Sequence, residues 1–133
     1  MGRTALLTSA GTEVVFDEGE SGDVLGTLYD ASGAVLAKSA IVTLKATLIN
    51  AADETTINSR SAQDIRDTNG GYVTSAGALT LKLQADDNII VDSTIPTGES
   101  ETHYIDIEWT WVDSDADTRK GKELKWFKVL NVA

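Results

Sequence analysis

The segment "DSDADTRKGK" near the C-terminus holds the residues best spaced to do chemistry. Three aspartates at alternate positions are followed directly by a basic run: Asp113, Asp115, Asp117, Arg119, Lys120 and Lys122. Alternate aspartates supply the first oxygen ligands of a calcium loop, which also needs a glycine after the third ligand and a closing glutamate. Thr118 and Leu124 occupy those two places, and the flanking residues are typical of strands. We therefore expect the tip of a long β-hairpin, with weak calcium binding at the three aspartates as the alternative.

Asp106 and Glu108 form the best candidate pair of catalytic carboxylates. On one strand they would share a face and lie about 6.5–7 Å apart, within the range of about 5–9.5 Å that separates the two acids of glycosidases. Glycosidases also need a substrate cleft and an apolar environment that raises the pKa of one acid. Asp106 and Glu108 alternate with apolar residues, so we expect them to face water and to play no catalytic role.

His103 is the only histidine, so any histidine-based chemistry would have to use it. A serine hydrolase would also need a Gly-x-Ser-x-Gly elbow, which the sequence lacks, and one histidine cannot form the usual catalytic zinc site. We expect His103 at the surface or at a strand end. Cysteine is absent, and the glycines of "NGGYVTSAG" match no phosphate-binding loop. The sequence thus predicts no catalytic residue, no cofactor and no resident metal, and hence no enzyme.

The charge of the chain is large, negative and unevenly distributed. The net charge is -10, which argues against nucleic acid as a partner because phosphate binding needs clustered lysine and arginine. Residues 1–118 carry six basic and twenty acidic side chains, whereas residues 119–133 carry five basic side chains and one acidic side chain. Two interpretations stay open: a solvated hairpin of mixed charge, or a basic strand that docks on an acidic surface of a neighbouring subunit or partner.

Period-two alternation of apolar and polar residues is the main signal for secondary structure, because successive side chains of a strand point to opposite faces. It predicts three strands, at residues 41–50, 78–84 and 103–112, the first with Val42, Leu44, Ala46 and Leu48 on its buried face. Weaker strands are expected at 13–16, 24–30, 34–38, 71–74 and 124–132, and at most one helical turn at 59–67. Turn signals recur at the spacing of a sandwich or barrel. We expect an all-β fold.

The domain organisation is expected to be simple. With 133 residues, of which 41% are hydrophobic, the chain is the size of one globular domain. Residues 1–22 are expected to form an N-terminal arm or edge segment, followed by one domain at 23–133. No apolar run reaches the ~20 residues that span a bilayer, and the first residues do not resemble a secretory signal. We therefore expect no membrane partner, and either folding in the compartment of synthesis or export by a route that needs no signal.

The aromatic residues suggest both a core and a contact surface. Trp109 and Trp111 share a strand face with isoleucines and are expected in the core. Trp126 and Phe127 are adjacent, so they must point to opposite faces of a strand, and one of them is expected to leave the core as an interface anchor. The candidate interface residues are Arg119, Lys120, Lys122, Lys125, Trp126 and Phe127.

Several short elements carry a resemblance that covers about residues 24–132. They are an Asn-x-Arg and Gln-Asp element, an Asn-Gly turn, a Leu-Thr strand, an Asp-Asn-x-Ile-Val-Asp segment and a closing hairpin with Trp and Gly-Lys: Asn58, Arg60, Gln63, Asp64, Asn69, Gly70, Leu79, Thr80, residues 87–92, Trp109, Trp111, Gly121 and Lys122. In these elements the chain resembles small immunoglobulin-like proteins encoded in the virion-assembly gene blocks of tailed bacteriophages.

The resemblance implies a single immunoglobulin-like antiparallel β-sandwich that serves as a non-enzymatic virion component. Capsid decoration or a head–tail accessory role is then expected. Its partners would be other virion proteins (capsid, portal or tail subunits), in a homo-oligomer or a symmetric array on the particle. The protein would be made in the host cytoplasm and located in the virion. The alternative is a carbohydrate- or cell-surface-binding β-sandwich module of a fibre or adhesin.

Overall fold

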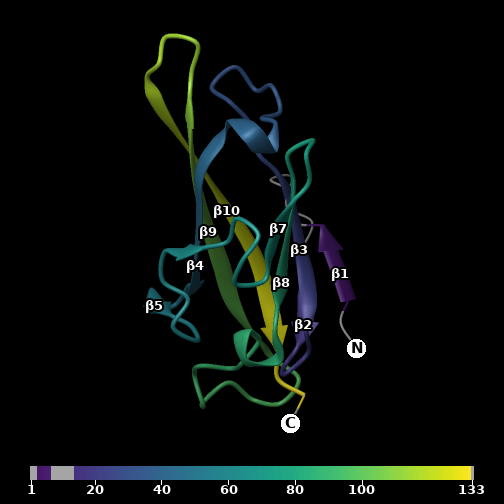
Figure 1. Cartoon of the computed structure of the whole chain (residues 1–133). Helices are drawn as coiled ribbons and strands as arrows, with labels where there is room; N and C mark the ends of the chain where they lie inside the picture. Colours follow the sequence, from purple (N-terminus) through teal and green to yellow (C-terminus); the bar gives the residue numbers. More distant parts are fainter. Residues whose placement is uncertain (1–2, 7–13, 133) are drawn as a thin grey trace.

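The computed structural model describes the backbone of residues 3–6 and 14–132, and side chains from residue 14 onward. The described chain is all-β, as the alternation predicts, and its strands form two sheets with the orders β1-β3-β8-β7 and β2-β10-β9-β4-β5 (Figure 1). A further short strand, β6, pairs with β4. The strands are β1 (Arg3–Leu6), β2 (Val15–Asp17), β3 (Gly22–Thr27), β4 (Ile41–Asn50), β5 (Thr55–Thr56), β6 (Gln63–Asp64), β7 (Gly71–Val73), β8 (Ala78–Leu83), β9 (Ser100–Val112) and β10 (Thr118–Leu130).

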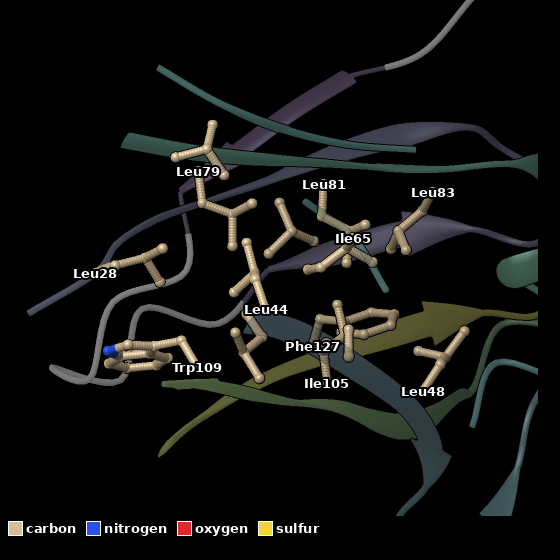
Figure 2. Packing of buried hydrophobic residues seen from close by; sticks show 14 of the residues in the cluster. Leu28, Leu44, Leu48, Ile65, Leu79, Leu81, Leu83, Ile105, Trp109 and Phe127 are labelled. Atoms are coloured by element: carbon tan, nitrogen blue, oxygen red, sulfur yellow. The ribbon is translucent and has the colours of Figure 1, made fainter. Parts of the chain in front are cut away.

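The core lies between the two sheets. Leu79, Leu81 and Leu83 of the smaller sheet point toward side chains of the larger sheet, among them Ile105 and Phe127 (Figure 2). All five of these side chains are at most 2% exposed. Burial of a large aliphatic or aromatic side chain contributes about 1.5–3 kcal/mol to folding, so this inner layer is the main source of stability. The arrangement is that of a sandwich-like fold.

The long β9–β10 hairpin forms the centre of the larger sheet. The two strands pair in register along their full length, and β4 pairs with the other edge of β9. Trp109 and Trp111 are 4% and 6% exposed, which confirms that they belong to the core. Trp109 lies over Gly121 of β10, where an added Cβ would come within 2.4 Å of the indole ring. A glycine is therefore required there for steric reasons.

Strand β4 corrects one detail of the predicted alternation. The register between β4 and β9 shifts between Ile41 and Thr43. Ile41 and Thr43 pair with the adjacent residues Trp111 and Thr110, so Val42 is an extra residue in β4. Such a β-bulge reverses which side chains point inward on one side of it. Ile41 is consequently buried, whereas Val42 is 58% exposed, so the prediction that Val42 faces the core was wrong.

Two predicted local elements are absent from the described chain. Residues 59–67 form no helical turn; Ser59, Ala62 and Asp67 have positive φ angles, a conformation that interrupts a right-handed helix. Residues 34–38 form no strand beyond one isolated bridge between Tyr29 and Val35.

The N-terminal residues contribute edge strands to both sheets. β1 pairs with β3, and β2 pairs with β10, and both pairings are parallel, whereas the other described strand pairs of the two sheets are antiparallel. β3 begins at Gly22, so it includes the expected boundary between residues 22 and 23. Within the described residues, no helix is long and apolar enough to cross a membrane.

Candidate interaction surface

Alternate residues of β9 and β10 build the outer face of the larger sheet. Inward positions of β10 such as Phe127 and Val129 are buried, so the intervening residues point outward. Leu124 and Trp126 are 39% and 51% exposed on this face. The other outward side chains of β9 and β10 here include Tyr104, Asp106, Glu108, Lys120 and Lys122.

The charged half of this surface is a cross-strand ladder. Lys120 Nζ lies 3.3 Å from Glu108 Oε2, and Lys122 Nζ lies 3.1 Å from Asp106 Oδ2. The neighbouring Asp106 carboxylate raises the pKa of Lys122. Such exposed pairs contribute about 0–1 kcal/mol each. The two carboxylates considered as a catalytic pair thus lie on the outer face of the sheet, each in an ion pair with a lysine of β10.

The aromatic half of the surface is a stacked pair. The rings of Trp126 and Tyr104 lie 4.6 Å apart at an interplanar angle of 35°. The Tyr104 hydroxyl donates a hydrogen bond to the Glu54 carboxylate, and this bond raises the pKa of Tyr104. The pair therefore presents a large apolar area held in one orientation and half open to solvent.

Two of the six candidate interface residues are buried. Phe127 is 2% exposed and packs edge-to-face against Phe16, with ring centroids 5.6 Å apart. Lys125 is 6% exposed, and its Nζ lies 2.7 Å from Glu123 Oε1. Both residues occupy inward positions of β10 between the sheets, which corrects their assignment to an exposed interface. Four candidates remain at the surface: Arg119, Lys120, Lys122 and Trp126.

The hairpin tip does not gather its three aspartates into one site. Asp113 Oδ1 accepts hydrogen bonds from the backbone N–H groups of Asp115 and Asp117 at 2.9 and 3.0 Å. Its Oδ2 accepts one from Arg119 Nε at 2.7 Å, and this contact lowers the pKa of Asp113. The Asp113 carboxylate therefore shapes the turn itself. Over residues 14–132, no group of three or more His, Cys, Asp or Glu side chains is arranged to hold a metal ion.

His103 lies near the start of β9 and is buried, so of the two predicted places, the surface or a strand end, the surface was wrong. Its side chain is 0% exposed, and Nε2 lies 2.6 Å from Oε1 of Glu101. The Glu101 carboxylate also accepts the backbone N–H groups of Val91 and Asp92, both at 2.8 Å. The hydrogen bond to this carboxylate offsets the cost of burying the polar ring. The same carboxylate also joins the start of β9 to the preceding loop.

The pKa of His103 gives the protein a testable pH dependence. Burial lowers this pKa below its usual value, against the opposing effect of Glu101. Nδ1 is buried without a hydrogen-bond partner, so a second proton on the ring would add an unsatisfied donor, which is costly. The folded state therefore holds a neutral ring, whereas the unfolded chain takes up a proton near pH 6.5.

We expect the stability linked to His103 to be fully present above about pH 6.5 and to be lost as the pH falls below it, with a slope of at most about 1.4 kcal/mol per pH unit. Urea unfolding between pH 7.5 and 5 measures this slope. The carboxylates whose pKa is lowered, such as Asp67 and Asp113, take up protons, and so change the stability, only at more acidic pH. The His103→Gln variant should lack the slope above pH 5, and an equal slope in that variant would contradict the assignment.

A second buried polar cluster joins residues that are distant in the sequence. Asp87 Oδ1 accepts hydrogen bonds from Arg60 Nε at 2.7 Å and from Asn58 Nδ2 at 2.8 Å. Arg60 Nη1 also donates to the carbonyl oxygen of Asn69 at 2.9 Å. Gln63 Oε1 lies 3.3 Å from Arg60 Nη1, so three of the short elements that carried the resemblance meet in one network. The network fastens loops between the strands.

Fold and surface together define an all-β protein of two packed sheets with an open, charged and aromatic face. Comparison of the chain with family models, with curated proteins and with solved structures found no match.

Proposed function

We propose that the protein is a non-enzymatic structural component of a tailed-phage virion, an immunoglobulin-like sandwich that decorates the capsid or serves as a head–tail accessory protein. The observation that carries the proposal is the outer face of the larger sheet, where Trp126 is 51% exposed beside lysines of β10. The proposal also depends on the resemblance of residues 24–132 to virion proteins of this kind.

The composition of this face supports binding to another protein. Half-exposed tryptophan is among the residues most enriched at the energetic centre of interfaces. Lys120 and Lys122 lie on the same face of β10 as Trp126, on a chain whose net charge is -10. We therefore take an acidic partner, such as a capsid, portal or tail subunit, to fit this face. Weak contacts repeated around a symmetric shell would give high avidity without a strong single interface.

A second candidate function is supported by the same aromatic pair. Stacked Trp126 and Tyr104 present a ring surface of the kind on which sugars pack, because aromatic faces are large and apolar. A carbohydrate- or cell-surface-binding module of a fibre or adhesin would use this surface for a glycan instead of a protein.

Binding of the purified protein to two kinds of target separates the candidates. It is incubated with phage capsids lacking it and, separately, with a glycan array. The proposed function predicts co-sedimentation with the particles that is reduced at least tenfold, about 1.4 kcal/mol, by Trp126→Ala. Glycan binding that depends on Trp126, without particle association, would replace the first candidate with the second.

Neutralising two lysines of β10 should weaken particle association without unfolding the protein. We expect the double variant Lys120→Gln, Lys122→Gln to bind particles about tenfold more weakly, because electrostatic attraction is lost. Its unfolding temperature should change little, because exposed ion pairs contribute about 0–1 kcal/mol each. Lys82→Gln, at an exposed position of β8 on the other sheet, is the matched control. Equal binding of the double variant and the control would remove the lysines from the interface.

A further inference from the structure

Among the described residues, the outer edge of β10 pairs with one short strand, β2. β2 pairs with β10 only at Lys128, Val129 and Leu130. Along residues 118–126, no described strand lies on the side of β10 opposite to β9. Figure 1 shows the tip of the β9–β10 hairpin projecting beyond the other strands.

The backbone groups that face this edge can be assigned from the hydrogen bonds at its two ends. At the tip, Asp113 N–H donates to the carbonyl of Asp117, so odd-numbered residues of β10 bond toward β9. At the other end, Lys128 N–H donates to Val14 and Leu130 C=O accepts from Glu18, so even-numbered residues bond away from β9. Backbone groups alternate sides along a strand. The N–H and C=O groups of five residues therefore point outward along this edge: Thr118, Lys120, Lys122, Leu124 and Trp126.

The edge of the smaller sheet at β7 is closed by comparison. There the outward N–H of Val73 donates to Asp67 Oδ1 at 3.1 Å, and the N–H of Gly71 donates to the carbonyl of Thr68 at 2.8 Å. The chain's own loop thus takes up the outward donors of β7, which is one way in which proteins block edge pairing. No described residue accepts the outward N–H groups of Lys120, Lys122 and Leu124 in this way.

The chemistry beside this edge of β10 selects the strand that would fit it. Lys120 and Lys122 lie between the edge and the acids of β9, so an added strand meets positive charge first. A second copy of β10 would bring lysines against lysines, which is unfavourable. An acidic strand turns the same charges into attraction.

Both faces of the edge also offer apolar contacts. On the outer face, Leu124 and Trp126 are exposed. On the other side, a shallow groove next to Gly121 is lined by Tyr29, Ala31 and Trp109, with Asp30 and Glu123 also in its wall. A neighbouring strand would place its alternate side chains over these two surfaces.

From this geometry we infer that residues 118–126 of β10 accept an extended acidic segment of another protein as an added strand of the larger sheet. Backbone hydrogen bonds would supply affinity, and the lysines, Trp126 and the groove would select the sequence. The inference rests on the proposed function only in taking the donor of the segment to be another virion protein.

The test uses a synthetic ten-residue peptide of alternating glutamate and valine with the full chain at low salt. Titration followed by NMR should shift the amide signals of Lys120, Lys122 and Leu124 and slow their hydrogen exchange. A peptide of the same sequence with alternate N-methylated amides cannot form the ladder and should bind at least tenfold more weakly. A peptide with lysine in place of glutamate should also bind at least tenfold more weakly.

Two protein variants give matched controls for the peptide titration. Leu124→Pro removes one outward N–H and no bond to β9, a placement that edge strands tolerate. It should bind the peptide about tenfold more weakly than Leu124→Ala, which loses the same side-chain contact but keeps the N–H. The double variant Lys120→Glu, Lys122→Glu should bind the basic peptide more tightly than the acidic one. This second test stands even if Leu124→Pro does not fold.

The outcomes distinguish this inference from the proposed function. Absence of binding by the acidic peptide at millimolar concentration, or equal binding of its N-methylated form, would overturn strand addition. Particle association that persists in Leu124→Pro but is lost in Trp126→Ala would keep the virion role and reject the edge as its contact. Peptide binding without any particle association would keep the edge and reject the virion role.

Discussion

Replacing Asp87 with alanine is expected to destabilise the protein by about 3–5 kcal/mol, the usual cost of removing one partner from a buried ion pair. Asp87 is 0% exposed. Its Oδ1 accepts hydrogen bonds from Arg60 and Asn58, and its Oδ2 accepts the backbone N–H of Gln84 at 2.7 Å. Alanine would leave the Arg60 guanidinium, 9% exposed, as a buried charge without its carboxylate.

The neighbouring residue provides the control for this prediction. Asp86 is exposed in the same short 3-10 helix, Ala85–Asp87. Its replacement by alanine removes the same charge from the chain, and the expected change lies within about 0.5 kcal/mol. Chemical denaturation of the two variants measures the difference. Similar stabilities for the two would show that the Arg60–Asp87 pair contributes nothing beyond surface charge.

A double variant tests whether the cost arises from the unpaired charge. Arg60→Leu with Asp87→Leu removes both charges, and replacement of a buried pair by apolar residues is often close to neutral. We expect the double variant to be more stable than Asp87→Ala. If it is less stable, the hydrogen bonds that Arg60 makes to loop residues such as Asn69 contribute more than the ion pair.

The strands with strict alternation were predictable from the sequence. Residues 41–50, 78–84 and 103–112 correspond to β4, β8 and β9, because each has one apolar and one polar face. β10 was predicted only from residue 124 onward, although it begins at Thr118. The basic residues of its first half carry no apolar pattern, and pairing with β9 imposes the strand there.

The buried polar groups were not predictable from local pattern. The alternation that placed Ile105 and Trp109 in the core also places His103 and Glu101 there, but the polarity of these two side chains argued for the surface. Their mutual hydrogen bond offsets the cost of burial, and it becomes evident only when both face inward. The Arg60–Asp87 pair joins residues 27 positions apart, so no short motif could reveal it.

These buried contacts bear on the proposed surface. The Glu101–His103 pair holds the loop before β9 to the backbone of Val91 and Asp92, and His103 packs edge-to-face on Phe127, with ring centroids 5.6 Å apart. Phe127 is the residue after Trp126 in β10. A rigid inner layer under the outer face lowers the ordering cost when a partner binds.

Alanine at Phe127 and alanine at Trp126 should therefore have opposite effects on folding and binding. Phe127→Ala is expected to cost about 3–5 kcal/mol, as is typical of a buried phenylalanine, because it opens a cavity between Phe16 and His103. Trp126→Ala should cost no more than about 0.5–1.5 kcal/mol from its stacking on Tyr104.

The binding measurement is what makes this comparison decisive for the proposed function. Trp126→Ala should keep nearly the full free energy of unfolding and lose particle association, since the variant removes exposed aromatic area and leaves the core intact. Phe127→Leu, which keeps most of the core volume, should retain both folding and association and so controls for any change in β10. Loss of association in Phe127→Leu but not in Trp126→Ala would mean that the contact surface lies elsewhere on the molecule.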